Sequence, residues 1–219
     1  MSEERGHTTA GGRAVTAVAW AVLLLGLWLW GRDVTGLPEN PAGTAHGDVA
    51  GLGGIPLPAP ATPLPDSAPQ RVDIPQLAVQ APVVARGLDS RGGIDPPPFD
   101  QAGVVGWYGA GTTPGAAGTA LLVGHVDTET RPAVFYRLST LEPGDSVRVV
   151  RADGKVARFV IDDVEVLPTD RFDAGRAYGT RHPGRAELRL ITCGGTYDRV
   201  SRSYTANVVV SAYLTGTGG

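Results

Sequence analysis

The sequence predicts a mostly β domain that follows a membrane helix and a disordered spacer. Three observations predict this arrangement: an uncharged apolar run near the N-terminus, a stretch rich in proline, glycine and alanine, and a series of short segments in which apolar and polar residues alternate. The 219 residues allow one ordinary domain with appendages. The net charge of −3 gives no electrostatic reason to expect nucleic acid as a partner.

The apolar run covers residues 14–31 and contains no charged side chain. As a helix it would be about 27 Å long, close to the thickness of the hydrocarbon core of a bilayer. Trp28 and Trp30 lie at its end, where indole rings favour the membrane interface. The run exceeds the usual apolar region of a signal peptide and has no clear A-x-A-like site at its end. We therefore expect a retained transmembrane anchor, with a cleaved signal peptide as the alternative.

The charges around this run predict its orientation. Arg5 and Arg13 precede the run, and only Arg32 adds a basic residue directly after it. This weak bias places residues 1–13 in the cytoplasm and the bulk of the chain outside, as a single-pass membrane protein.

Residues 32–70 have the composition of a spacer. They are dense in proline, glycine and alanine and contain few aromatic side chains. Such a stretch cannot bury enough apolar surface to offset the entropy of ordering its backbone. We expect disorder, with polyproline II character in "PLPAPATPLP".

Residues 71–219 contain the β-type segments. Asp153-Gly154 lies between two of them and predicts a tight hairpin. The spacing of the segments suits a closed barrel or a sandwich, mostly antiparallel. The clearest segments are "VDIPQLAVQAPVV", "TALLVGHVD", "DSVRVVRADGKVARFVIDDVEVLP", "AELRLITC" and "YTANVVVSAYL".

Cys193 is the only cysteine, so no intramolecular disulfide can form. It ends an apolar segment and precedes two glycines, a position at which a side chain can meet a substrate. The plain alternative is a buried core thiol, because free cysteine is among the most buried residue types. An extracytoplasmic location favours the reactive interpretation, since an unused free thiol is a liability there.

His125 is the best partner for this thiol, because it also follows an apolar segment. Imidazole can stabilise a thiolate and later protonate a leaving amine. Arg199 and Arg202, just before the last segment, are candidates to stabilise an oxyanion. The alternatives are a structural histidine and two solvated loop arginines. No metal-ligand or nucleotide-binding pattern is found in the sequence, so neither a metal nor a cofactor is expected.

The stretches "GWYGAGTTPGAAGTALLVGHVD", "FYRLSTLEPGDSVRV" and "LRLITCGGTYD…SYTANVVVSAYL" resemble a sortase, with the greatest likeness to the class F type of actinobacteria. This resemblance implies a closed eight-stranded β-barrel with short helices, attached to the membrane. It implies a cysteine transpeptidase that cleaves an L-P-x-T-G-type sorting signal through a thioester. The acyl group would pass to an amine of a peptidoglycan precursor or a pilin.

By position, the resemblance makes Cys193 the nucleophile, His125 the general acid and base, and Thr192 the threonine of the family's T-C pair. The family's arginine lies near the start of the last strand. Arg202 is the first candidate and Arg199 the second, while Thr205 or Ala206 stands at the usual place.

Two other functions are considered. An L,D-type transpeptidase is disfavoured because its S-H-G-C arrangement is missing around "LITCGG". A non-catalytic adhesin or scaffold displayed on a stalk would need no contact between cysteine and histidine. An inert, buried thiol would favour the scaffold, and an accessible thiol tuned by histidine would favour the enzyme.

Overall fold

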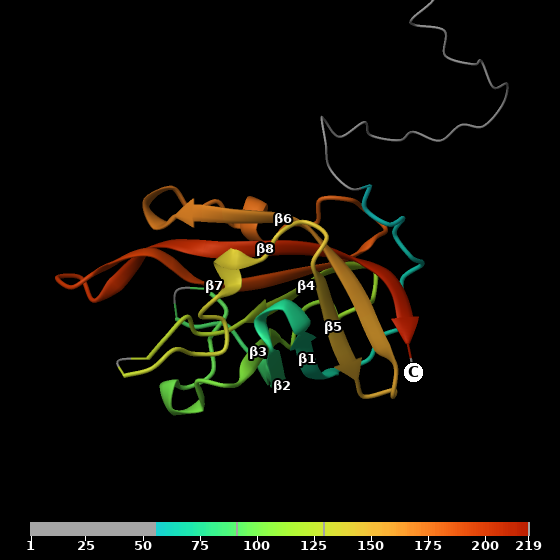
Figure 1. Cartoon of the computed structure of the whole chain (residues 1–219), viewed down its shortest axis with the longest axis horizontal. Helices are drawn as coiled ribbons and strands as arrows, with labels where there is room; N and C mark the ends of the chain where they lie inside the picture. Colours follow the sequence, from blue (N-terminus) through green and yellow to red (C-terminus); the bar gives the residue numbers. More distant parts are fainter. Residues whose placement is uncertain (1–55, 91, 129, 219) are drawn as a thin grey trace, which may run out of the picture. The chain divides into compact units, whose positions relative to one another are not determined.

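The computed structural model describes residues 56–90, 92–128 and 130–218. In this part of the chain, eight strands close into a barrel in the order β1-β2-β3-β4-β7-β8-β6-β5 (Figure 1). The predicted mostly β, closed eight-stranded barrel is therefore confirmed. The strands are β1 (Pro69–Ile74), β2 (Val79–Arg86), β3 (Val105–Tyr108), β4 (Gly118–Val123), β5 (Ser146–Arg151), β6 (Val156–Pro168), β7 (Ala186–Asp198) and β8 (Ser203–Gly218).

Helices in the described residues are short. They are the 3-10 turns η1 (Pro75–Leu77), η2 (Phe99–Gln101), η3 (Leu138–Thr140) and η4 (Thr169–Arg171), and the helix α2 (Ala174–Tyr178). None of them is long and apolar enough to cross a membrane. The anchor expected over residues 14–31 and the tail 1–13 lie outside the described residues.

Most neighbouring strands pair antiparallel, but two pairs are parallel: β2 with β3, and β4 with β7. The second parallel pair positions the site. Its register places Val123, the last residue of β4, opposite Ile191, which lies two residues before Cys193 on β7. The residues just after Val123 and just after Ile191 are therefore neighbours, although about 70 positions of sequence separate them.

The barrel wall has an inner and an outer apolar face. Leu188 and Leu190 of β7 point into the main core, while Ile191 belongs to a second apolar cluster with Val123 and Val209. Successive side chains of a strand point to opposite faces. Continuing this alternation along β7 puts Thr192 on the inner face and Cys193 on the outer face.

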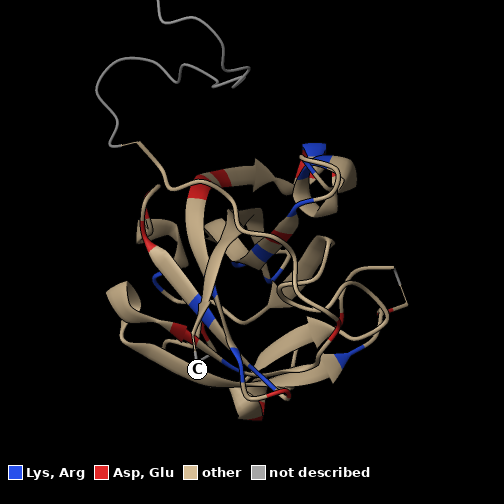
Figure 2. Cartoon of the chain, turned by 90° about the vertical axis from the view of Figure 1, so that its right-hand side faces the viewer, with Lys and Arg blue, Asp and Glu red and all other residues tan. Residues whose placement is uncertain are grey.

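The connection between β6 and β7, which includes η4 and α2, is held against the outer face by ion pairs. The guanidinium of Arg181 lies 2.7 Å from Asp163 on β6. Buried Glu187 on β7 pairs with buried Arg189 at 2.8 Å and accepts hydrogen bonds from the backbone N–H groups of Arg181 and His182. Basic and acidic residues are interspersed along the ribbon in Figure 2. These contacts fix the connection whose first residues border the site.

The segment 56–68 differs from the expected disordered spacer. It lies against the barrel, where the N–H of Ala61 donates to the carbonyl of Leu214 and that of Leu64 donates to Gly115, both within 2.8 Å. The Tyr213 hydroxyl donates to the carbonyl of Pro58 at 2.6 Å. β1 then begins at Pro69, before the expected domain start at Arg71. Proline lacks an N–H but keeps a carbonyl acceptor, which is how this proline-rich stretch is held.

The hairpin predicted at Asp153-Gly154 is confirmed between β5 and β6. Gly154 has a φ of +79°, which glycine adopts without steric cost. Its N–H donates to the carbonyl of Arg151 at 3.1 Å, closing the turn.

Candidate active site

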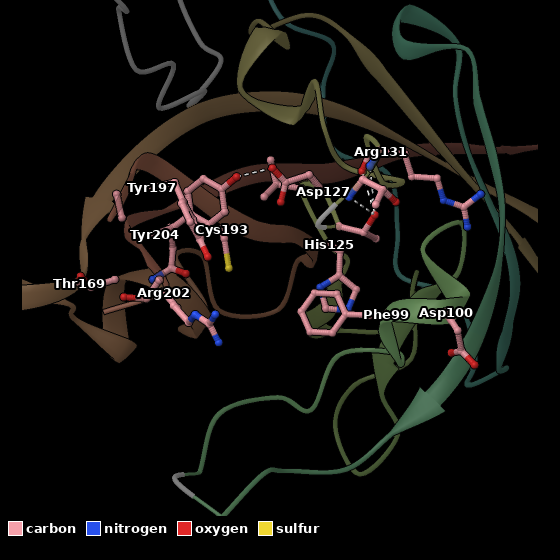
Figure 3. A pocket seen from close by; sticks show the side chains of 16 residues that line it. Phe99, Asp100, His125, Asp127, Arg131, Thr169, Cys193, Tyr197, Arg202 and Tyr204 are labelled. Atoms are coloured by element: carbon pink, nitrogen blue, oxygen red, sulfur yellow. Dashed lines mark hydrogen bonds between the residues drawn. The ribbon is translucent and has the colours of Figure 1, made fainter. Parts of the chain in front are cut away.

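A cleft with a volume of about 1280 Å³ opens on the outer face of the barrel, where the pairing of β4 with β7 ends. Cys193 and His125 both line it, together with Arg202. Figure 3 shows the sulfur of Cys193 and the ring of His125 projecting into the same space. The structure therefore brings together the thiol, the imidazole and one of the two arginines that the sequence singled out.

Cys193 is exposed as a residue, unlike the seven buried residues of β7 that precede it. The walls of the cleft still partly desolvate its sulfur, and this burial raises the pKa of the thiol. The nearby carboxylate of Asp127 raises that pKa further, because it disfavours a second negative charge. The Cys193 sulfur thus favours the protonated thiol, so its reaction as a nucleophile requires a base to remove the proton.

His125 lines the same cleft, and its ring is held from two sides. Its Nε2 atom lies 2.6 Å from the carbonyl oxygen of Pro97. A carbonyl can only accept, so Nε2 carries the proton and Nδ1 is left as the basic nitrogen. The ring of Phe99 stacks on the imidazole, with centroids 4.3 Å apart and an angle of 19° between the planes (Figure 3).

Arg202 lines the cleft from the turn between β7 and β8. Its φ is +52°, in the left-handed region that costs a non-glycine residue roughly 1 kcal/mol. In Figure 3 its guanidinium extends into the cleft beside Cys193. It makes no hydrogen bond or ion pair with any residue that the structure describes. This cation is therefore available to a ligand in the cleft.

Arg199 and Thr192 lie apart from this group. Arg199 is exposed in the same turn but does not line the cleft. Thr192 is 4% exposed, does not line the cleft, and its hydroxyl has no hydrogen-bond partner among the described residues.

Thr205 and Ala206 stand where the sequence resemblance leads us to expect an arginine, but neither residue is charged. The hydroxyl of Thr205 accepts from the N–H of Thr196 at 3.0 Å, and its carbonyl accepts from the Thr169 hydroxyl at 3.0 Å. Thr205 thus links β8 both to β7 and to η4 in the β6–β7 connection. Ala206 borders the cleft but carries no polar group. Among the three positions at this end of β8, only Arg202 brings a positive charge to the cleft.

A contact that sequence reasoning missed joins the segment after β4 to β8. The hydroxyl of Tyr204 donates a hydrogen bond to Asp127, two residues beyond His125 (Figure 3). This bond to a carboxylate raises the pKa of Tyr204 to about 12. The ring of Tyr204 also meets Tyr197 edge to face, with centroids 5.2 Å apart. The hydrogen bond between Tyr204 and Asp127 therefore links the segment that carries His125 to β8, the strand that pairs with β7 at Cys193.

Comparisons with known proteins agree with this arrangement. A family model described as the Sortase domain matches residues 72–215. No curated protein sequence matches the chain. Among solved structures, sortase C-1 from Actinomyces oris is 23% identical, covers 67% of this chain and 73% of its own, and gives a TM-score of 0.51.

Two further structures are similar. The SrtA sortase from Actinomyces oris is 18% identical, covers 75% of this chain and 87% of its own, and gives a TM-score of 0.52. A lid mutant of sortase A from Corynebacterium diphtheriae is 16% identical, covers 67% of this chain and 69% of its own, and gives a TM-score of 0.51. At these identities the structures show the fold, and the family match over most of the barrel shows the relationship. The chain belongs to the sortase family of cysteine transpeptidases.

Proposed function

We propose that this protein is a membrane-anchored transpeptidase that cleaves an L-P-x-T-G-type sorting signal through a thioester on Cys193. It then transfers the acyl group to an amine of a peptidoglycan precursor or a pilin. The observation that carries the proposal is that the chain's only thiol, His125 and Arg202, which has no partner among the described residues, line one cleft.

The first half-reaction forms the thioester. Nδ1 of His125 takes the thiol proton as the Cys193 sulfur attacks the threonine carbonyl of the signal. The carbonyl electron pair moves to oxygen, where the guanidinium of Arg202 stabilises the new charge. When this intermediate collapses, the carbon–nitrogen bond breaks and His125 protonates the leaving glycine amine.

The second half-reaction reverses these roles. An acceptor amine attacks the thioester carbonyl, and His125 removes a proton from the attacking nitrogen. The carbon–sulfur bond then breaks and Cys193 leaves with its electron pair, to be protonated by the imidazolium. The bond from Nε2 to Pro97 suits both steps, since it fixes the tautomer in which Nδ1 exchanges the proton.

The location follows from the N-terminal sequence. The apolar run 14–31 would anchor the chain, with residues 1–13 in the cytoplasm and the barrel outside. Residues 32–55 would act as the spacer between the bilayer and the segment that packs on the barrel.

The test uses the full chain in detergent, mixed with an L-P-x-T-G peptide and a small amine such as triglycine. Intact mass should show an acyl adduct on Cys193, and the peptide products should include the amine-ligated form. Cys193→Ala should give neither product and should unfold at the same temperature as the wild type. A folded wild-type chain that forms no adduct with a panel of such peptides would favour the scaffold function instead.

A further inference from the structure

Asn207 stands directly beside the thiol. In the register of β7 and β8, Cys193 pairs with Asn207, and on its other side Asn207 pairs with Leu167 of β6. Opposed residues of an antiparallel pair point to the same face, with Cβ atoms about 5 Å apart. The carboxamide of Asn207 therefore projects from the same face as the sulfur.

The histidine lies on the opposite side of this thiol. The parallel register of β4 and β7 pairs Val123 with Ile191, and the N–H of Gly124 still donates to the carbonyl of Ile191 at 3.1 Å. Two residues further along each chain, His125 is level with Cys193. The nucleophile is thus flanked by an imidazole on the β4 side and by a carboxamide on the β8 side.

The carboxamide of Asn207 is available to a ligand. Asn207 lines the cleft and is partly buried. Its side chain makes no hydrogen bond with any residue that the structure describes. A polar group that is partly removed from water and lacks a partner gains most from a ligand that supplies one. Its backbone is fixed on both sides, because β8 lies between β6 and β7.

We propose that the carboxamide N–H of Asn207 donates a hydrogen bond to the oxyanion of the tetrahedral intermediate on Cys193. This inference rests on the proposed transpeptidase function and assigns a second donor beside Arg202. As the sulfur–carbon bond forms, the carbonyl electron pair moves to oxygen, and the N–H donates without transferring its proton. A rigid neutral donor beside the nucleophile complements a charged donor on a turn, because it costs no reorganisation when the charge appears.

This role separates Asn207 from its neighbours on β8. Thr205 uses its hydroxyl to accept from the backbone of Thr196, and Ala206 has no donor. The Tyr204 hydroxyl is engaged by Asp127. Of the polar side chains from 204 to 207, only that of Asn207 makes no hydrogen bond at all among the described residues.

The test compares Asn207→Ala and Asn207→Leu with the wild type in the full chain, using an L-P-x-T-G peptide and triglycine. Leucine keeps the approximate shape of asparagine and removes both donors, so agreement between the variants excludes a cavity effect. Thr217→Ala, an exposed change at the far end of β8, is the matched control. Removal of one oxyanion donor lowers kcat by about 10²-fold.

We expect both Asn207 variants to lose about 10²-fold in kcat with little change in KM, while iodoacetamide alkylates Cys193 at the wild-type rate. Alkylation forms no oxyanion, so it reports on the thiol alone. Unchanged kcat, a change confined to KM, or slower alkylation would each overturn the assignment. If the wild type itself forms no thioester, the proposed function fails; if it does and the variants match it, only the role of Asn207 fails.

Discussion

Two arginines at opposite ends of β4 have opposite surroundings. Arg151 is fully buried near the start of β4 and donates to the carbonyls of Pro114 and Pro65, each at 2.6 Å, and to Asp153 at 3.1 Å. Arg202 borders the cleft beyond the end of β4, exposed and without a described partner. The guanidinium of Arg151 is thus fully used in structural hydrogen bonds, whereas that of Arg202 has no partner among the described residues.

This difference indicates that Arg151 contributes to the stability of the fold and that Arg202 contributes to the chemistry of the cleft. A buried guanidinium with its donors satisfied holds distant backbone segments together, and its loss would leave their carbonyls unpaired. An unpaired guanidinium in a cleft contributes little to folding and keeps its full charge for a ligand. Substitutions at the two ends should therefore affect different measurements.

The largest effect is expected from Arg151→Met. The carbonyls of Pro65 and Pro114 and the carboxylate of Asp153 would lose their donor, for a cost of about 3–5 kcal/mol in the free energy of unfolding. Urea denaturation of the full chain measures this cost. The activity of the remaining folded protein should stay near wild type, and a large loss of kcat without loss of stability would contradict the comparison.

Arg202→Ala should give the reverse result. We expect kcat for transpeptidation to fall by about 10²–10³-fold, because the charged donor to the oxyanion is lost. The free energy of unfolding should change by less than about 0.5 kcal/mol, as for other exposed sites. Steady-state kinetics and urea denaturation on the same preparation check both parts. If Arg202→Ala lowered the free energy of unfolding as much as Arg151→Met, the proposed difference between the two arginines would be wrong.

Asp127→Asn tests how the charge of this carboxylate affects the pKa values of Cys193 and Tyr204. Its carboxylate raises the pKa of Cys193 in addition to burial, so the neutral amide should lower that pKa. The pH profile for alkylation of Cys193 by iodoacetamide should then move to lower pH. The Tyr204 phenol should also ionise below its present pKa of about 12, as followed by ultraviolet absorbance. A thiol profile that moves to higher pH would contradict this account.

Arg199→Ala should have the smallest effect. The side chain is exposed and does not line the cleft, although it lies only three residues from Arg202. We expect kcat and KM within about twofold of the wild type, which makes this variant the matched control for Arg202→Ala. A loss as large as that of Arg202→Ala would show that the turn as a whole, and not one guanidinium, supports catalysis.

The sequence predicted the barrel and the thiol–imidazole pair for a clear reason. Cys193 and His125 each follow an apolar segment, and local patterns of this kind survive in a single sequence. The bond between Tyr204 and Asp127 joins residues 77 positions apart, and Arg151 reaches Pro65 over 86. Such contacts depend on strand order and register, which no local pattern contains.

The segment 56–68 shows a different limit of the sequence. Its proline and alanine content is typical of a disordered spacer, and composition alone cannot show that its carbonyls meet donors on the barrel. Those donors include Tyr213 and Arg151, which lie about 150 and 90 positions further along the chain. The site residue Asn207 was missed for a related reason, since only the register of β7 and β8 places it beside Cys193.

The attachment of residues 56–68 also has a mechanical consequence. A tension on the chain before residue 56 would be carried by the bonds to Leu214, Gly115 and Arg151. Tyr213 pairs with Glu187 near the start of β7, whereas Cys193 stands six residues further along that strand. The load would therefore enter the barrel at the end remote from the cleft, so a chain under tension could keep the spacing of its catalytic groups.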